Sequence, residues 1–244
     1  MRFHVSPLIL AAALGCGVLL LPGPARAADE VQTADVLVKL FKAGRTVVSE
    51  HQAVINDASK GDKGFTPAYF VDRVIDKFRD QTKIDLRQPP ESAQARLLLT
   101  LVESGREVVA EAQPVINKQG VAFKGFLPAV WARKTGERFT RKTGLRLKLT
   151  ASVWRYPGNR PDEFEADALR ILSDPSYPKG KDYSKTVMVN GRPVYRTLTP
   201  EYAAASCLVC HGQPKGERDI TGGKKEGYKE GDLAGAISLM IPVR

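Results

Sequence analysis

Two stretches of the chain repeat apolar residues at the three- and four-residue spacing of an amphipathic helix. In the first, the apolar stripe consists of Leu37, Leu40, Phe41, Gly44, Val47, Val48, His51, Val54 and Ile55. In the second, it consists of Leu98, Leu101, Val102, Gly105, Val108, Val109, Ala112, Val115 and Ile116. This pattern predicts two long helices that pack by these faces. The glycines at 44 and 105 would let another helix or a flat ligand approach closely.

The two stretches belong to an internal repeat with an ungapped offset of 61 residues. "GRTVVSEHQAVINDASKGDKGFTPAYF" begins at Gly44, and "GREVVAEAQPVINKQGVAFKGFLPAVW" begins at Gly105. The loop "KGF" and the following proline repeat in register with the helices, so we interpret the pattern as a partial duplication. The first copy should therefore pack on the second copy or on another subunit, because half a domain cannot bury its apolar faces alone.

Further elements follow each predicted long helix. Thr66 and Pro67 indicate an N-cap with proline at the first helical position. Residues 145–151 alternate as a strand does, and Pro161 is expected to open another helix. Two β-rich runs surround Asn190 and Gly191, a strong signal for a type I′ hairpin, and a last strand is expected at residues 235–243. Together the elements predict an α+β fold with helices on an antiparallel sheet.

The first residues have the pattern of a secretory signal peptide. Arg2 precedes an apolar run at residues 8–21, and Ala25-Arg26-Ala27 forms a small-x-small cleavage site. The run is shorter than a membrane span and is followed by "PGP", and no other stretch is apolar enough to span. A lipoprotein signal at Cys16 is a weaker alternative. We therefore expect export to the periplasm and no membrane span in the mature chain.

Removal of residues 1–27 changes what charge and cysteines imply. The formal net charge falls from +10 to +8, because only Arg2 and Arg26 are lost. An exported basic protein seldom meets nucleic acid, so the charge favours acidic partner proteins over DNA or RNA. Only Cys207 and Cys210 remain, and they form one local pair. In an oxidising compartment, several scattered cysteines would form a disulfide framework, and the mature sequence has none.

The segment "CLVCH" at residues 207–211 matches the attachment pattern of c-type haem. Two thiols separated by two residues can add to the two vinyl groups of one porphyrin, and His211 can then serve as proximal ligand to the iron. Structural zinc normally needs four ligands, and beyond His211 the mature chain offers only His51. A thioredoxin-type dithiol would need a βαβ context, and a plain disulfide would not require the histidine.

The segments "RYPGNRPDEFEADAL", "CLVCHG" and "EGYKEGDLAGAISLMIP" together resemble the PAS-like c-type haem domain of a cyanobacterial mono-haem cytochrome and of periplasmic sensor regions of histidine kinases. The resemblance implies one covalent haem c on a PAS-like antiparallel sheet with flanking helices, attached through Cys207, Cys210 and His211. It covers about residues 105–244. In that family the distal ligand comes from the N-terminal helical region and can be a cysteine, which this chain lacks there.

The second axial ligand has three candidates of the usual types. His51 lies on the first apolar stripe, although a histidine there is more often a packed core residue, and the equivalent residue of the second copy is Ala112. Met188 and Met240 are the others, and a methionine in either place is more often ordinary core filling. An open or water-bound distal site, or an unusual donor, is the remaining alternative.

Basic and aromatic residues near the motif in sequence are weaker candidates for the haem pocket. Arg155 is expected to reach a propionate, and Tyr228 is expected to line the pocket because it lies in "EGYKEGD". Other candidates of the same two kinds are Arg160, Lys224, Lys225, Trp154 and Tyr156.

The sequence thus predicts four segments: a signal peptide at 1–27, a helical partial repeat at 28–88, a linker at 89–92 and a PAS-like haem domain at 93–244. The expected function is an exported mono-haem cytochrome for electron transfer or redox sensing, and an enzymatic role is less favoured. The alternative is a gas sensor or a peroxidase-like haem enzyme with an open distal site. Expected partners are an acidic redox protein or a membrane-bound signalling protein, and a homodimer is a further option.

Overall fold

The computed structural model describes residues 24–243, and the side chains of residues 29–243. The predicted signal peptide therefore lies almost entirely outside the described residues. The main helices are α1 (Pro24–Glu50), α2 (Gln52–Ile55), α3 (Pro67–Thr82), α4 (Ala93–Ile116), α5 (Pro128–Thr143), α6 (Glu163–Leu172) and α7 (Leu208–His211). The strands are β1 (Arg146–Thr150), β2 (Tyr183–Val189), β3 (Arg192–Tyr202) and β4 (Leu233–Pro242). No helix among the described residues combines the length and apolarity needed to cross a membrane.

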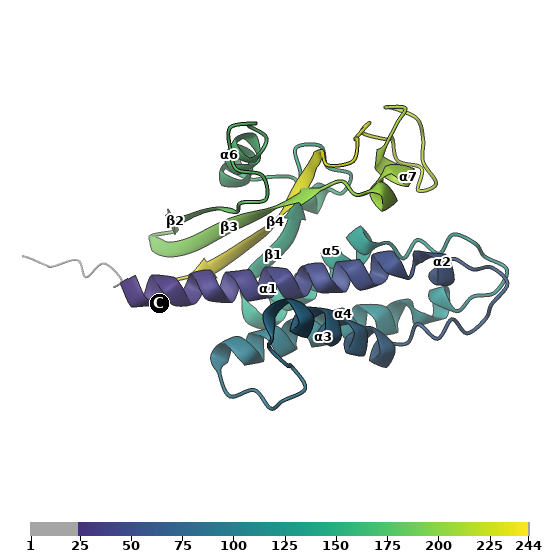
Figure 1. Ribbon diagram of the computed structural model, residues 1–244, viewed down its shortest axis with the longest axis horizontal. Coiled ribbons are helices and arrows are strands. Elements are labelled where there is room, and N and C mark those ends of the chain that lie inside the picture. Colours follow the sequence, from purple (N-terminus) through teal and green to yellow (C-terminus); the bar gives the residue numbers. More distant parts are fainter. Residues whose placement is uncertain (1–23, 244) are drawn as a thin grey trace, which may run out of the picture.

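The strands form one antiparallel sheet in the order β1-β4-β3-β2, with helices on both faces (Figure 1). Alternate residues of β4 point to opposite faces, as in any strand. Ile237, Leu239 and Ile241 join the core under the four long helices, whereas Ala236 packs with α6 on the other face. The predicted α+β fold, with a sheet flanked by helices, is confirmed.

The duplicated helices pack on one another inside a single hydrophobic core. Its members come from the first copy, from the second copy and from the sheet, including Phe41, Phe78, Phe139 and Leu239. The first copy thus buries its apolar stripe on the second, as its sequence predicts. Helix α4 begins at Ala93 with Ser92 as its N-cap, directly after the predicted linker.

Trp131 makes the close approach that the two glycines allow. A Cβ atom built on Gly44 would lie 2.1 Å from Cη2 of the indole, and one on Gly105 would lie 2.8 Å from its Cζ2. The indole Nε1 donates to the Gly105 carbonyl at 3.2 Å, and the Trp131 residue is 2 % exposed. The flat group at these glycines is therefore a side chain of the second copy.

The two "VIN…KGF" loops are joined by reciprocal hydrogen bonds. Oδ1 of Asn56 accepts from the backbone N–H of Lys124 at 2.9 Å. Oδ1 of Asn117 accepts from the backbone N–H of Lys63 at 3.3 Å. Each asparagine thus satisfies a backbone donor of the other copy, which explains why these polar residues repeat along with the apolar stripe.

The hairpin and the helix after it illustrate what local sequence can specify. Asn190 and Gly191 have φ angles of 50° and 76°, as a type I′ turn requires, so this prediction is confirmed. The prediction that Pro161 opens α6 is wrong by two residues. Asp162 is the N-cap instead, because its carboxylate accepts from the Glu165 N–H while the Glu165 side chain accepts from the Asp162 N–H.

The cysteine motif lies where the chain leaves the sheet. A 3₁₀ turn at Ala205–Cys207 and the one-turn α7 follow the end of β3, and a long loop then leads back to β4. The Ala203 N–H donates to the Asp232 carbonyl, and the Gly231 N–H donates to the Ala203 carbonyl, each at 2.8 Å. These bonds close the base of the excursion, so residues 204–230 form a unit that projects from one end of the sheet.

Candidate functional site

The motif residues lie on one short helical turn. Cys207 ends the 3₁₀ turn, and Cys210 and His211 complete α7. The spacing of three residues places the two thiols on the same side of the turn. Both cysteines are free thiols of intermediate exposure. Burial, followed by the negative charge of Asp219, raises the pKa of the Cys210 thiol above its ordinary value.

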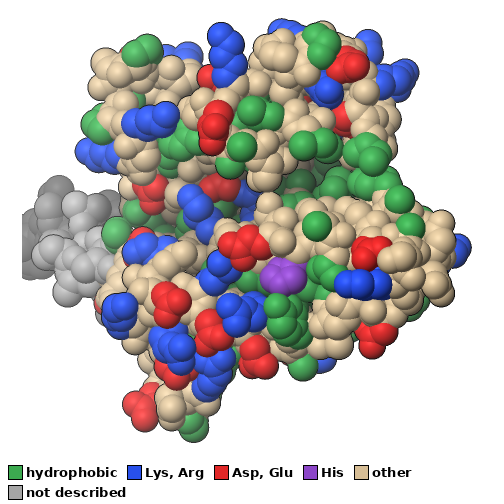
Figure 2. Space-filling model, turned by 45° about the vertical axis from the view of Figure 1, so that its right-hand side comes forward, with side chains coloured by type: hydrophobic (Ala, Val, Ile, Leu, Met, Phe, Trp, Pro, Cys, Tyr) green, Lys and Arg blue, Asp and Glu red, His purple; other side chains and the backbone are tan. Residues whose placement is uncertain are grey.

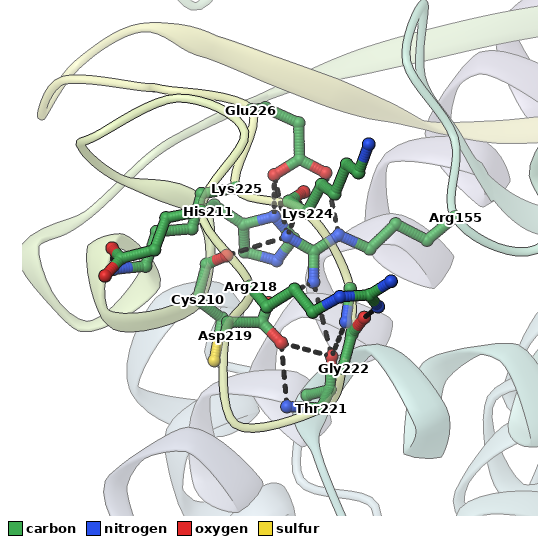
Figure 3. A network of polar contacts seen from close by, with 12 residues as sticks. Arg155, Cys210, His211, Arg218, Asp219, Thr221, Gly222, Lys224, Lys225 and Glu226 are labelled. Atoms are coloured by element: carbon green, nitrogen blue, oxygen red, sulfur yellow. Dashed lines mark hydrogen bonds and ion pairs between the residues drawn. The ribbon is translucent and has the colours of Figure 1, made fainter.

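His211 is held through one of its two ring nitrogens. Nδ1 lies 2.7 Å from Oε2 of Glu226 (Figure 3). Because an ionised carboxylate can only accept, Nδ1 carries the proton and donates it to Glu226. Among the hydrogen bonds of the described residues none involves Nε2, and the side chain is 37 % exposed. The imidazole therefore presents Nε2 as an acceptor nitrogen, the kind of atom with which a histidine can bind a metal ion.

Tyr228 stands beside this histidine, and its role in a haem pocket stays a prediction. The two rings are stacked with centroids 6.4 Å apart and an angle of 26° between their planes. The backbone N–H of Tyr228 also donates to the His211 carbonyl at 2.9 Å. Burial raises the pKa of the Tyr228 phenol, so the ring acts here as a neutral wall.

Arg155 anchors the carboxylate that holds His211. Its Nε and Nη2 donate to the two oxygens of Glu226 at 2.7 and 2.9 Å, a fork-to-fork pair. Its Nη2 also donates to the Cys210 carbonyl at 2.7 Å. Burial alone would raise the pKa of Glu226, but the hydrogen bonds from Arg155 and His211 outweigh it and hold the pKa below its ordinary value.

Asp219 completes the network on the other side of the guanidinium. Nη1 of Arg155 donates to its carboxylate at 2.5 Å, and the Asp219 side chain is fully buried. Burial would raise the Asp219 pKa, but hydrogen bonds from Thr221 and Arg155 lower it to about 2. The sequence predicts Arg155 as a propionate partner. The structure instead directs its donors to two carboxylates and to backbone carbonyls of this loop.

Large apolar side chains are uncovered around the motif. Most of the exposed large hydrophobic residues in the described chain fall in the 151–162 loop, in α7 and in the 212–230 loop, namely Val153, Trp154, Tyr156, Val209 and Ile220. Arg155 ties the first of these loops to the third. Figure 2 shows a hollow bordered by hydrophobic side chains between the upper and lower parts of the molecule. Exposed apolar surface of this kind marks interaction and ligand-binding sites, so the residues present fit the largely apolar haem that "CLVCH" predicts.

Three of the weaker pocket candidates, Trp154, Tyr156 and Arg160, belong to the 151–162 loop. The guanidinium of Arg133 in α5 lies 4.4 Å from the centre of the Tyr156 ring, and that of Arg160 lies 5.6 Å from the Trp154 ring. Arg160 thus covers an aromatic face. Lys225 pairs with Glu217 at 2.7 Å, and Lys224 contributes its carbonyl to Arg155 at 3.1 Å.

His51 has partners of its own. Nδ1 lies 2.7 Å from the Val47 carbonyl and Nε2 lies 2.9 Å from the Tyr69 hydroxyl, so both ring nitrogens are hydrogen-bonded. It lines a small pocket with Phe65 and Tyr69. It directly follows Glu50, the last residue of α1, and is the N-cap of α2. The role of His51 as distal ligand stays a prediction, and in this conformation neither nitrogen is available.

The two methionines lie toward the opposite end of the sheet. Met188 pairs with Pro193 and Met240 pairs with Arg196, whereas the motif follows Tyr202. At about 3.4 Å per residue, these partners are about 30 Å and 20 Å along β3 from its end. Met188 is also 67 % exposed. The sheet thus keeps both thioethers away from His211.

Sequence reasoning alone does not single out Glu226 and Asp219. Both lie in a glycine- and lysine-rich loop without periodicity, and their shared partner Arg155 is 71 and 64 residues away in the chain. One signal does exist, because Glu226 begins "EGYKEGD", a segment already distinctive beside the motif.

Comparison with known proteins places the chain in a family. The model of the Tll0287-like family matches residues 90–242, which is more than half of the chain, so the chain belongs to that family. Among solved structures, it is similar to the crystal structure of the cyanobacterial heme-protein Tll0287. The identity is 13 %, the TM-score is 0.42, and the alignment covers 91 % of this chain and 97 % of that one. The curated proteins contain no match.

Proposed function

We propose that the chain is an exported mono-haem c-type cytochrome that transfers electrons or reports redox state. The observation that carries the proposal is the geometry of His211: Nδ1 is hydrogen-bonded to Glu226, and no hydrogen bond among the described residues involves Nε2. The two free thiols belong to the same short segment. Membership of the Tll0287-like family supports it. The similar solved structure is that of a cyanobacterial heme-protein.

Each motif residue has a defined task in this proposal. Cys207 and Cys210 would hold the haem through thioethers, and Nε2 of His211 would be the ligand to its iron. Bound haem supplies an iron that changes between the ferric and ferrous states. Tyr228 stacks beside the histidine and limits the access of water, and Arg155 fixes the loop that carries the ligand.

The proposed partners follow from charge. Lys215, Lys224 and Lys229 are exposed on the loop after α7. Exposed lysines on the loop that follows the motif would help to steer an acidic redox protein, or an acidic surface of a membrane-bound signalling protein, toward this end of the molecule. The basic net charge of the whole chain acts in the same direction. This role requires export to the periplasm. The signal-peptide pattern of residues 1–27 supports such export.

A second function is favoured by the distal side. Both nitrogens of His51 are hydrogen-bonded elsewhere, and Met188 and Met240 belong to the far part of the sheet. This placement favours a distal position open to a small molecule, as in a gas sensor or a peroxidase-like enzyme. An electron carrier would instead recruit a strong second ligand by a rearrangement of α1.

The ferrous absorption spectrum with and without carbon monoxide tests both functions. A six-coordinate low-spin spectrum that ignores carbon monoxide supports electron transfer. A high-spin spectrum that shifts on its addition supports a gas-binding or peroxidase-like site. A preparation from a strain able to attach haem c that shows no haem absorption would contradict both.

A further inference from the structure

The hydrogen bond between Nδ1 of His211 and the carboxylate of Glu226 places a negative charge next to the imidazole. The carboxylate is 6 % exposed and lies 2.7 Å from Nδ1, so the hydrogen bond is charge-assisted and largely shielded from water. When a histidine binds a metal through one ring nitrogen, a carboxylate hydrogen-bonded to the other nitrogen fixes the tautomer and raises the basicity of the histidine as a ligand. The sequence motif requires only the histidine, so this partner is an addition of the fold.

The carboxylate is itself immobilised. Both of its oxygens receive hydrogen bonds from the Arg155 fork, and the same guanidinium holds the Cys210 carbonyl, one residue before the histidine. The guanidinium is anchored in turn by the buried Asp219. Hydrogen bonds therefore connect the loop after β1 to Nδ1 of His211 through Arg155 and Glu226.

We infer that Glu226, held by Arg155, is the positioning residue for His211 and sets a low reduction potential at the proposed haem. This inference rests on the proposed function. Reduction takes one electron from the redox partner and removes one positive charge from the iron, with no proton transferred. A buried negative group one imidazole away stabilises the more positive ferric state, and so it opposes reduction.

The test compares two glutamates of the same loop in the haem-loaded full chain. Glu226→Gln removes the charge next to His211 but keeps the size of the side chain. Glu217→Gln removes the same charge from a residue that pairs with Lys225 and is about half exposed. For Glu226→Gln we expect the equilibrium constant for reduction to rise about tenfold, a shift of about +59 mV for one electron. For Glu217→Gln we expect less than half that shift.

Equal shifts in the two variants, or a lower potential in Glu226→Gln, would overturn the inference. A structural role alone would lower the yield of folded protein without this directional change in potential. The potential of the wild type should also lie below that of the variant throughout a salt series, because a shielded contact is little screened.

A second measurement does not depend on haem. Nitrogen NMR of the haem-free full chain reports which nitrogen of His211 carries the proton, and we expect Nδ1 in the wild type and in Glu217→Gln. The strongly deshielded ring proton of a carboxylate contact should be lost in Glu226→Gln. A proton on Nε2 in the wild type would overturn the inference. Absence of haem from the wild type, with Nδ1 protonated, would instead count against the proposed function.

Discussion

Arg155 and Asp219 form an ion pair at 2.5 Å in which the aspartate side chain is fully buried, although 64 residues separate them in the chain. The pair joins the loop after β1 to the loop after α7. It is therefore a tertiary contact that fixes the motif-bearing loop on the sheet.

Replacement of Arg155 by alanine should destabilise this loop strongly. The change leaves the carboxylates of Asp219 and Glu226 buried without their cation, which costs about 3 kcal/mol. Hydrogen exchange of residues 205–230 should accelerate more than that of the helical core. Adding Asp219→Ala to Arg155→Ala should restore part of the loss, since the unpaired charge is removed. The exposed pair Arg170–Asp167 is the control, and Arg170→Ala should change stability by less than about 0.5 kcal/mol.

Gly44→Ala should destabilise the protein, although alanine is the better helix former. The gain in helix propensity is about 1 kcal/mol. A Cβ atom 2.1 Å from the Trp131 ring overpacks the core, and the ring is buried and hydrogen-bonded to Gly105, so the net loss should be about 1–3 kcal/mol in urea unfolding.

Trp131→Phe should relieve the effect of Gly44→Ala, because phenylalanine is the residue at the equivalent position 70 of the first copy. The double variant should therefore lose less than the sum of the single losses. Gly61→Ala is the matched control, since a Cβ there meets nothing within 4 Å. If Gly44→Ala is as stable as the wild type, the Trp131 ring does not pack closely against Gly44.

Asp162→Asn should lower stability in a pH-dependent way. Burial would raise the Asp162 pKa, but hydrogen bonds from the Glu165 N–H and the Arg196 guanidinium outweigh it and lower the pKa. The stabilising contribution is therefore complete above the unfolded pKa of about 4 and is lost as the pH falls through the lower folded value. Asparagine keeps the N-cap, so the variant loses the ion pairs to Arg196 and Arg146, about 1–2 kcal/mol at pH 7.

Urea unfolding of this variant and of the wild type should give a constant difference between about pH 6 and 8 that shrinks below about pH 4. Asp167→Asn, whose partner Arg170 is exposed, should show little difference at any pH. A difference for Asp162→Asn that persists at low pH would contradict the ionic origin of the effect.

His51→Ala should leave the spectrum of the haem protein unchanged. The structure uses both ring nitrogens for the Val47 carbonyl and the Tyr69 hydroxyl, so the expected effect is a stability loss of about 1 kcal/mol. Tyr69→Phe removes only the second contact and should give the same spectrum. Conversion from low-spin to high-spin in His51→Ala, but not in Tyr69→Phe, would identify His51 as the distal ligand.

Local signals in the sequence predicted much of the fold. The apolar stripes predicted α1 and α4, Thr66 capped α3 as expected, and Asn190-Gly191 formed its hairpin. These features depend on neighbours a few residues away. The helix α6 begins two residues after Pro161, because the capping box of Asp162 and Glu165, and not the proline, determines where it starts.

The site was predictable only where its chemistry is contiguous. Cys207, Cys210 and His211 follow one another, and their spacing alone indicates haem attachment. Glu226, Asp219 and Arg155 meet through loops of irregular conformation, and no periodicity relates them. From the sequence, Arg155 is a basic residue that could pair with a propionate. The fold brings two carboxylates to it, those of Asp219 and Glu226, and neither is near it in the sequence.

The most direct test of the account is the mass of the denatured protein after expression in a strain able to attach haem c. We expect the wild type to carry the added mass of one haem, retained in acid and organic solvent, and to give the haem c spectrum in alkaline pyridine. The Cys207→Ala/Cys210→Ala variant should lose the added mass while the chain still folds. A wild type without added mass, or a double variant that retains it, would contradict covalent haem attachment at Cys207 and Cys210.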